Sequence, residues 1–99
     1  MTFEQTVEEG VTVLRITGSL DAMSTPELRP TIEALVAART AHVVLDLDEL
    51  RLIDSSGVGA IVSLYKRMRA QGGHVTVRNL RDQPLAIFRL LRLDRVLSG

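Results

Sequence analysis

The chain has 99 residues, 45% of them hydrophobic, and its 12 basic and 12 acidic residues give a formal net charge of zero. This length supports one compact domain with its own core. The neutral charge argues against nucleic acid or an anionic membrane as partner. Because the sequence has no cysteine, disulfides, thiolate catalysis and cysteine-ligated metals are excluded.

The sequence carries no export or membrane signal. Residues 1–5 lack the basic flank and the apolar stretch of a signal peptide. No apolar run approaches the ~20 residues that span a bilayer. We therefore expect a soluble cytoplasmic protein that forms a single domain over residues 1–99.

The first part of the chain predicts a β-hairpin at a sheet edge. Residues 3–7 alternate weakly between apolar and polar, residues 8–10 are typical of a tight turn, and residues 11–16 are rich in β-branched side chains. Gly18 is expected to end the second strand, and residues 19–25 are expected to form a loop.

A first helix is predicted to begin near residue 25. Pro26 suits the first helical position, which makes Thr25 the N-cap, although Ser24 and Glu27 also fit a capping box. Pro30 removes one early hydrogen bond, and the helix should fade around residues 39–40. The apolar stripe of this helix is formed by Leu28, Ile32, Leu35 and Val36.

Strands and helices then alternate. Residues 42–47 are almost continuously apolar, as expected of a strand covered on both faces. A helix should follow to about residue 70, ended by the glycines at 72–73, and a short strand is expected at 74–77. A third helix should begin at Asp82 and point Ile87, Phe88 and Leu91 inward, before a short strand or coil at 93–97.

The order β-β-α-β-α-β-α indicates the α/β class. Strands that alternate with helices are typically parallel and joined by right-handed crossovers. We expect a mixed, mostly parallel sheet of four to five strands, an antiparallel edge hairpin and about three main helices.

One segment, residues 50–59, stands between the strand at 42–47 and the second helix, whose apolar positions recur at helical spacing. Asp54, Ser55, Ser56 and Gly57 fall at the expected helix N-terminus, where backbone N–H groups are unpaired. A serine there could cap the helix, with Asp54 stabilising the first turn, and the same position would receive a phosphate well. Local physics favours the capping role and leaves a functional serine open.

The helix after this segment carries small residues on the face opposite its apolar positions. At 100° per residue, four residues line up on that face, with Gly59 beside them. Small side chains would let another backbone come close, which suits the docking of a partner. The four residues are Ser56, Ala60, Ser63 and Arg67.

Catalysis by a serine lacks support. His42 and His74 stand at the N-terminal ends of strands, opposite the sheet edge where Ser55 should lie, which favours structural or surface roles for both over a base for Ser55. The G-x-S-x-G elbow is absent, and the glycines at 57 and 59 lack the remaining residues of a phosphate loop or a dinucleotide fingerprint.

The charged clusters are also expected to be structural or solvated. Carboxylates at the carboxyl edge of a sheet can hold magnesium, but without a second signal, solvated loop acids are the better interpretation. The acids concerned are Asp21, Asp46, Asp48 and Glu49. The arginines at 78, 81, 89, 92 and 95 have no aromatic residues between them, which favours a solvated face over nucleic-acid binding.

Several segments together resemble a known family. They are residues 16–21 (ITGSLD), 43–47 (VVLDL), 53–59 (IDSSGVG), 72–73 (GG) and 87–94 (IFRLLRLD). In this spacing they are similar to the anti-sigma factor antagonists, the single-domain bacterial members of the STAS group. The Asp-Ser-Ser-Gly segment between strand and helix is the most specific part.

The resemblance implies a switch rather than an enzyme. It implies that the unphosphorylated protein binds an anti-sigma factor that is also a serine kinase, which frees the sigma factor. Phosphorylation of Ser55 would end binding, and a serine phosphatase would restore it. ATP and magnesium would belong to the kinase, so no cofactor is expected, and a monomer is expected. The resemblance and the small-residue face of the second helix together give the expected partner-binding residues, which are Asp21, Asp54, Ser55, Ser56, Gly57, Gly59, Ala60, Ser63 and Arg67.

Two other functions stay open. One is a STAS module that never cycles through phosphate, such as an adaptor or a structural subunit of a signalling or transporter assembly. The other is a small serine hydrolase or nucleotide-binding protein. The chain also departs from the family pattern, because Leu91-Arg92 stands where a Thr-Gly commonly ends the last helix.

Overall fold

The computed structural model describes residues 1–97 of the chain. A β-hairpin opens the fold, strands and helices then alternate, and a short helix ends it. The elements are β1 (Thr2–Glu8), β2 (Val11–Leu20), α1 (Thr25–Ala37), β3 (His42–Asp46), β4 (Leu50–Ile53), α2 (Ser55–Ala70), β5 (His74–Arg78), α3 (Asp82–Leu90) and α4 (Leu93–Val96).

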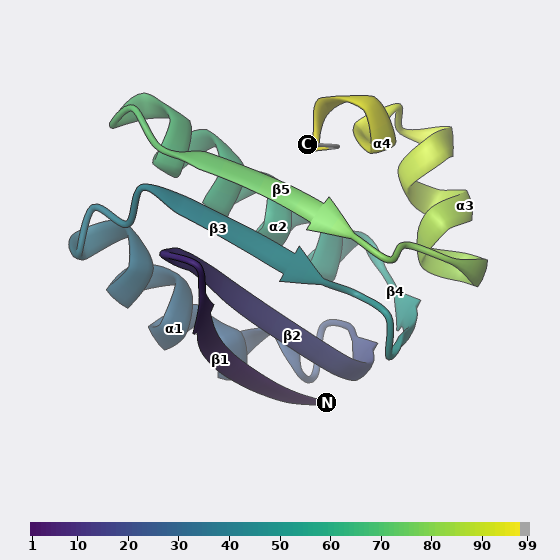
Figure 1. The fold of residues 1–99 in the computed structure, drawn as a ribbon. Coiled ribbons are helices and arrows are strands. Elements are labelled where there is room, and N and C mark those ends of the chain that lie inside the picture. The colour runs from purple at the N-terminus through teal and green to yellow at the C-terminus, as the bar shows by residue number, and fades with distance from the viewer. Residues whose placement is uncertain (98–99) are drawn as a thin grey trace.

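The five strands form one mixed sheet. Its main order is β1-β2-β3-β5, and β4 pairs with the end of β2. Only the β1–β2 pairing is antiparallel, which confirms the predicted edge hairpin and parallel core. Helices α1 and α2 both lie behind the sheet in Figure 1, and α3 and α4 lie at the end toward which β3 and β5 point.

Strand β2 is longer than expected because it has two partners in turn. Its first half pairs with β3, and from Gly18 onward it pairs with β4, with a register shift between Gly18 and Ser19. Gly18 has a φ of +94°, and its N–H donates to the Glu49 carbonyl at 3.0 Å. The expectation that Gly18 ends the strand is therefore wrong, and β4 is a strand that the sequence did not reveal.

The core lies between the sheet and the helices. Leu14, Ile16, Val43 and Leu45 contribute the sheet side and are buried together with the apolar faces of α1 and α2. Phe88 of α3 joins the same cluster and is fully buried. The apolar stripes predicted for the first two helices thus pack into one contiguous core, and Phe88 of α3 closes its end nearest to β4.

The helix α1 begins at Thr25, as expected, but its cap and the expected C-terminal segment need correction. The N-cap is Ser24 and not Thr25, and its side chain makes no capping hydrogen bond, so the capping box does not form. Residues 93–96 form the helix α4 in place of the expected strand or coil, and the carbonyl of its C-cap, Leu97, accepts a hydrogen bond from the Val77 N–H at 2.7 Å. Leu91, expected inside, is 51% exposed.

Leu91 points outward because the helix ends one residue earlier. Arg92 adopts a left-handed φ of +60° and takes the place that glycine commonly fills after a helix. The chain therefore reverses at 91–92 without a glycine, and α3 ends as in a glycine-capped helix.

One face of the sheet carries no helix, so the expectation that β3 is covered on both faces is wrong (Figure 1). His42 and Val44 on this face are only half-buried. Asp46 lies there too, yet it is only 2% exposed. Its expected role as a solvated loop acid is therefore also wrong.

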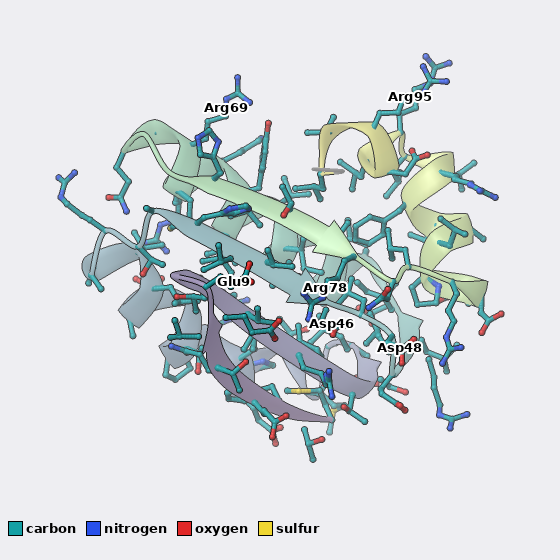
Figure 2. The ribbon with its side chains drawn as sticks, viewed as in Figure 1. Glu9, Asp46, Asp48, Arg69, Arg78 and Arg95 are labelled. Carbon is teal, nitrogen blue, oxygen red and sulfur yellow. The ribbon has the colours of Figure 1, made fainter. Side chains whose placement is uncertain are left out.

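Asp46 is buried because cations cover it from both neighbouring strands. Arg15 and Arg78 are its register partners, and their guanidinium groups donate to its Oδ2 at 3.2 and 3.3 Å. The Asn79 amide and the Asp48 N–H donate to its Oδ1. Figure 2 shows Asp46 and Arg78 close together on the open face.

These contacts decide the charge state of Asp46. Burial raises the pKa of the Asp46 carboxyl, but the hydrogen bonds from Asn79, Asp48, Arg78 and Arg15 outweigh burial and hold the pKa below its usual value. A depressed folded-state pKa stabilises the protein above the unfolded pKa of about 3.9. That stability is lost as the pH falls through the folded value.

We predict that Asp46→Asn lowers the free energy of unfolding at pH 7 by about 3 kcal/mol, because two arginines lose a buried counter-charge. The deficit should shrink as the pH falls below about 4. Urea unfolding from pH 7 to pH 2 measures it. Asp48→Asn is the matched control, since Asp48 pairs with Arg81 on the surface at 3.6 Å. A pH-independent deficit would contradict the assignment.

Candidate functional site

Asp54 caps the helix α2. It follows β4 directly, and its Oδ1 accepts hydrogen bonds from the N–H groups of Ser56 and Gly57 at 2.9 and 3.1 Å. Its Oδ2 accepts a third from the Ala22 N–H at 3.1 Å. One carboxylate therefore satisfies two unpaired N–H groups of the helix and also ties down the β2–α1 loop.

This arrangement corrects the interpretation in which a serine caps the helix. Asp54 is the N-cap, and Ser55 is the first helical residue. Neither the Ser55 nor the Ser56 hydroxyl makes a hydrogen bond within the described residues 1–97. Ser55 is exposed and Ser56 is half-buried. Both hydroxyls are therefore available for reaction or contact, because the cap is supplied by another residue.

Gly57 allows the turn to pack against β2. A Cβ at this position would lie 2.6 Å from the Leu20 carbonyl oxygen and 2.7 Å from Ile53 Cγ1. The same carbonyl accepts a hydrogen bond from the Asp54 N–H at 3.2 Å. Gly57, predicted to bind a partner, is itself buried. Its observed contribution is to let the helix start lie against the sheet edge.

The loop after β2 is shaped by Asp21. Its Oδ1 accepts hydrogen bonds from the Met23 and Ser24 N–H groups, both at 3.0 Å, and from the Ser24 hydroxyl at 3.1 Å. These bonds, above all the one from the Ser24 N–H, lower the pKa of the Asp21 carboxyl. The loop presents Met23 with 88% of its surface exposed. Because Asp54 accepts a hydrogen bond from the Ala22 N–H, this loop is attached to residues 54–57, which we call the serine turn.

A polar groove runs between α1 and α2. It has a volume of about 540 Å³, and its α2 wall is the predicted stripe of small residues with both serines at one end. Arg67 donates two hydrogen bonds to Glu33 of α1, one of them at 3.0 Å. The stripe therefore lies along the groove beside α1, where Ala60 is buried and Ser63 and Arg67 are exposed. The groove is lined by Arg29, Ile32, Glu33, Ser55, Ser56, Gly59, Ala60, Ser63 and Arg67.

An apolar groove lies on the other side of α2, toward α3. It has a volume of about 420 Å³, and Ser55 and Gly59 line it as well as the polar groove. Leu90 and Leu91 form part of its far wall and are 77% and 51% exposed. The remaining lining residues are Ile53, Asp54, Val58, Val62 and Ile87.

The predicted site residues thus come together at one end of the molecule. The loop that contains Asp21 adjoins the Asp54 cap and the first turn of α2, residues 55–59. Arg67 lies farther along the polar groove. The sequence did not reveal the α1 wall with Arg29 and Glu33, nor the apolar wall on α3. Only the packing of one helix on another brings those residues to the serines.

Other kinds of site find no support among the described residues. His42 and His74 lie at the N-terminal ends of β3 and β5, as expected, and their ring centroids are 6.2 Å apart. Residues 1–97 hold no group of three or more His, Cys, Asp or Glu side chains that could bind a metal. Within the same range, no helix has the length and apolar character needed to cross a membrane.

Comparison with known proteins identifies the family. The STAS domain family matches residues 2–98. The chain belongs to the STAS domain family. The predicted STAS-like fold, a mixed and mostly parallel sheet of four to five strands, is confirmed, and the sheet has five strands.

Proteins similar to this STAS domain include anti-sigma factor antagonists. The anti-sigma F factor antagonist of Paenibacillus polymyxa is 36% identical over 69 residues, which are 69% of this chain and 59% of that protein. The crystal structure of an anti-sigma factor antagonist from Mycobacterium paratuberculosis has a TM-score of 0.83 at 25% identity, over 97% of this chain and 81% of the other. The phosphorylated form of Bacillus SpoIIAA has a TM-score of 0.79 at 20% identity, over 99% and 89%.

Two glycines in this STAS domain should respond oppositely to alanine. Gly57→Ala should lower the free energy of unfolding by roughly 1–3 kcal/mol, because the new methyl meets the Leu20 carbonyl. Gly59→Ala should raise it by about 1 kcal/mol, because a Cβ there meets nothing within 4 Å and alanine favours the helix. Chemical unfolding of both variants tests this pair, and equal effects would contradict the packing described.

Proposed function

We propose that this STAS domain is an anti-sigma factor antagonist that is switched by phosphorylation of Ser55. In the unphosphorylated state it binds an anti-sigma factor that is also a serine kinase, and the sigma factor is released. Phosphate on Ser55 ends this binding, and a serine phosphatase restores it. The domain is a substrate and a binding module, with no catalytic role of its own.

This proposal rests on the observation that Asp54, and not Ser55, caps the helix α2. Asp54 makes all the capping hydrogen bonds of α2, and the Ser55 hydroxyl is exposed and makes none within the described residues. A kinase can therefore reach this hydroxyl without dismantling the helix start. The position also tolerates the product, since a helix N-terminus favours negative charge.

The two grooves support a partner surface centred on the same serine. Ser55 lines both the polar groove beside α1 and the apolar groove beside α3. Leu90 and Leu91 in the apolar groove, and Met23 on the loop tied to Asp54, are large exposed apolar side chains. Apolar side chains exposed around a polar centre are typical of a protein interface.

Phosphorylation would act on this surface through charge and volume. A phosphate adds about −1.5 to −2 charges, and here it would stand beside the Asp54 carboxylate and at the mouth of the apolar groove. Desolvating such a group against an apolar partner surface removes several kcal/mol of binding energy. We therefore expect the affinity to fall more than a hundredfold while the fold stays intact.

The test combines the purified protein, ATP and each candidate anti-sigma kinase of its own genome, and follows the intact mass. We expect one phosphate in wild-type protein and in Ser56→Ala, and none in Ser55→Ala. Because neither hydroxyl makes a hydrogen bond within the described residues, we expect the two alanine variants to have similar stability. Phosphorylation should coincide with release of the kinase in gel filtration.

Three results would overturn the proposal. Phosphate retained in Ser55→Ala would move the switch to another residue. Tight binding to a candidate kinase without any phosphate would make the domain a constitutive adaptor. Hydrolysis of simple esters that Ser55→Ala abolishes would make it an enzyme.

A further inference from the structure

Gln83, the second residue of α3, pairs with the backbone of β4. The Ile53 N–H donates to Gln83 Oε1 at 2.9 Å, and Gln83 Nε2 donates to the Ile53 carbonyl at 2.9 Å. One carboxamide thus satisfies both backbone groups of a single residue. It occupies the place that a neighbouring strand would take, because β4 pairs only with β2 among the described strands.

This pairing fixes the residue that precedes the cap. Ile53 is the last residue of β4 and is the register partner of Leu20 in β2. The next N–H, that of Asp54, donates to the Leu20 carbonyl. The β4 end is therefore held by β2 on one side and by Gln83 on the other, directly before the carboxylate that positions Ser55.

The same helix also forms the wall of the apolar groove. Ile87, Leu90 and Leu91 line that groove, and they follow Gln83 on one continuous element and the turn after it. A partner that binds in this groove would therefore contact α3, the helix whose Gln83 holds the serine turn.

We propose that Gln83 is a positioning residue that sets how Ser55 is presented to the kinase and links α3 to the serine turn. The effect of Gln83 on phosphorylation rests on the proposed function. Its hydrogen bonds to Ile53, which position the turn, do not depend on that proposal. Only glutamine fits both bonds: glutamate offers no donor for the Ile53 carbonyl, leucine offers neither group, and asparagine is one methylene shorter.

The chain supplies a matched control in Gln71. This half-buried glutamine donates from Nε2 to the Val36 carbonyl at 2.8 Å, at the far end of α2 from Ser55. Gln71→Leu and Gln83→Leu both remove a side-chain hydrogen bond to backbone. They differ in whether the backbone concerned leads into the serine turn.

The experiment measures amide hydrogen exchange in both variants and the rate of Ser55 phosphorylation by the kinase that modifies wild-type protein. In Gln83→Leu we expect the Asp54, Ser56 and Gly57 amides to exchange at least tenfold faster than in Gln71→Leu. We expect kcat/KM of phosphorylation to fall at least tenfold in Gln83→Leu, and to stay within twofold of wild type in Gln71→Leu. Gln83→Glu should resemble Gln83→Leu in both readouts.

Unchanged exchange at Asp54, Ser56 and Gly57 in Gln83→Leu would overturn the inference, because Gln83 would then not hold the turn. Faster exchange with wild-type phosphorylation kinetics would overturn the link to the kinase. If no candidate kinase modifies wild-type protein, the proposed function fails. The exchange comparison still decides whether Gln83 positions the turn.

Discussion

The structure depends on one carboxylate, that of Asp54. It caps α2 through the Ser56 and Gly57 N–H groups and holds the β2–α1 loop through Ala22. Three chain segments, β4, α2 and the loop after β2, meet at this side chain. A serine cap could satisfy the helix only by using its hydroxyl, whereas the aspartate cap leaves the exposed Ser55 hydroxyl without a hydrogen bond within the described residues. Chemical availability of the serine and stability of the helix are thus supplied by different residues.

That separation suits a domain whose state must change without unfolding. The turn is fixed from several directions: by the Leu20 carbonyl, by the close packing of Gly57 and by the carboxamide of Gln83. A phosphate at Ser55 would project from this fixed base into the region where the polar and apolar grooves meet. In the proposed switch, phosphorylation therefore changes the charge and shape of the surface and leaves the fold unchanged. The sheet, with the buried Asp46 network on its open face, supplies the stability that the fold needs for this.

The sequence predicted the parts that local physics controls. The hairpin, the helix spans and the place of residues 54–57 between strand and helix follow from periodicity and turn chemistry. The rest depends on long-range pairing. Strand β4 is four residues long and forms only because β2 extends beyond the end of its pairing with β3. Asp46 is buried only because the strand register places Arg15 and Arg78 beside it. Likewise, the side of α2 that carries Ser56 and Arg67 lies along the groove beside α1. The residue pattern of a single helix cannot show which neighbour that side adjoins.

The most direct test of this account is the amide spectrum of the protein before and after phosphorylation of Ser55, recorded by nuclear magnetic resonance. The account predicts that chemical-shift changes are confined to the serine turn and the groove walls on α1 and α3. The Ser56 and Gly57 amides should remain hydrogen-bonded to Asp54. Loss of those two hydrogen bonds, or changes spread through β3 and β5, would contradict it. The phosphate would then act by rebuilding the turn and not by altering its surface.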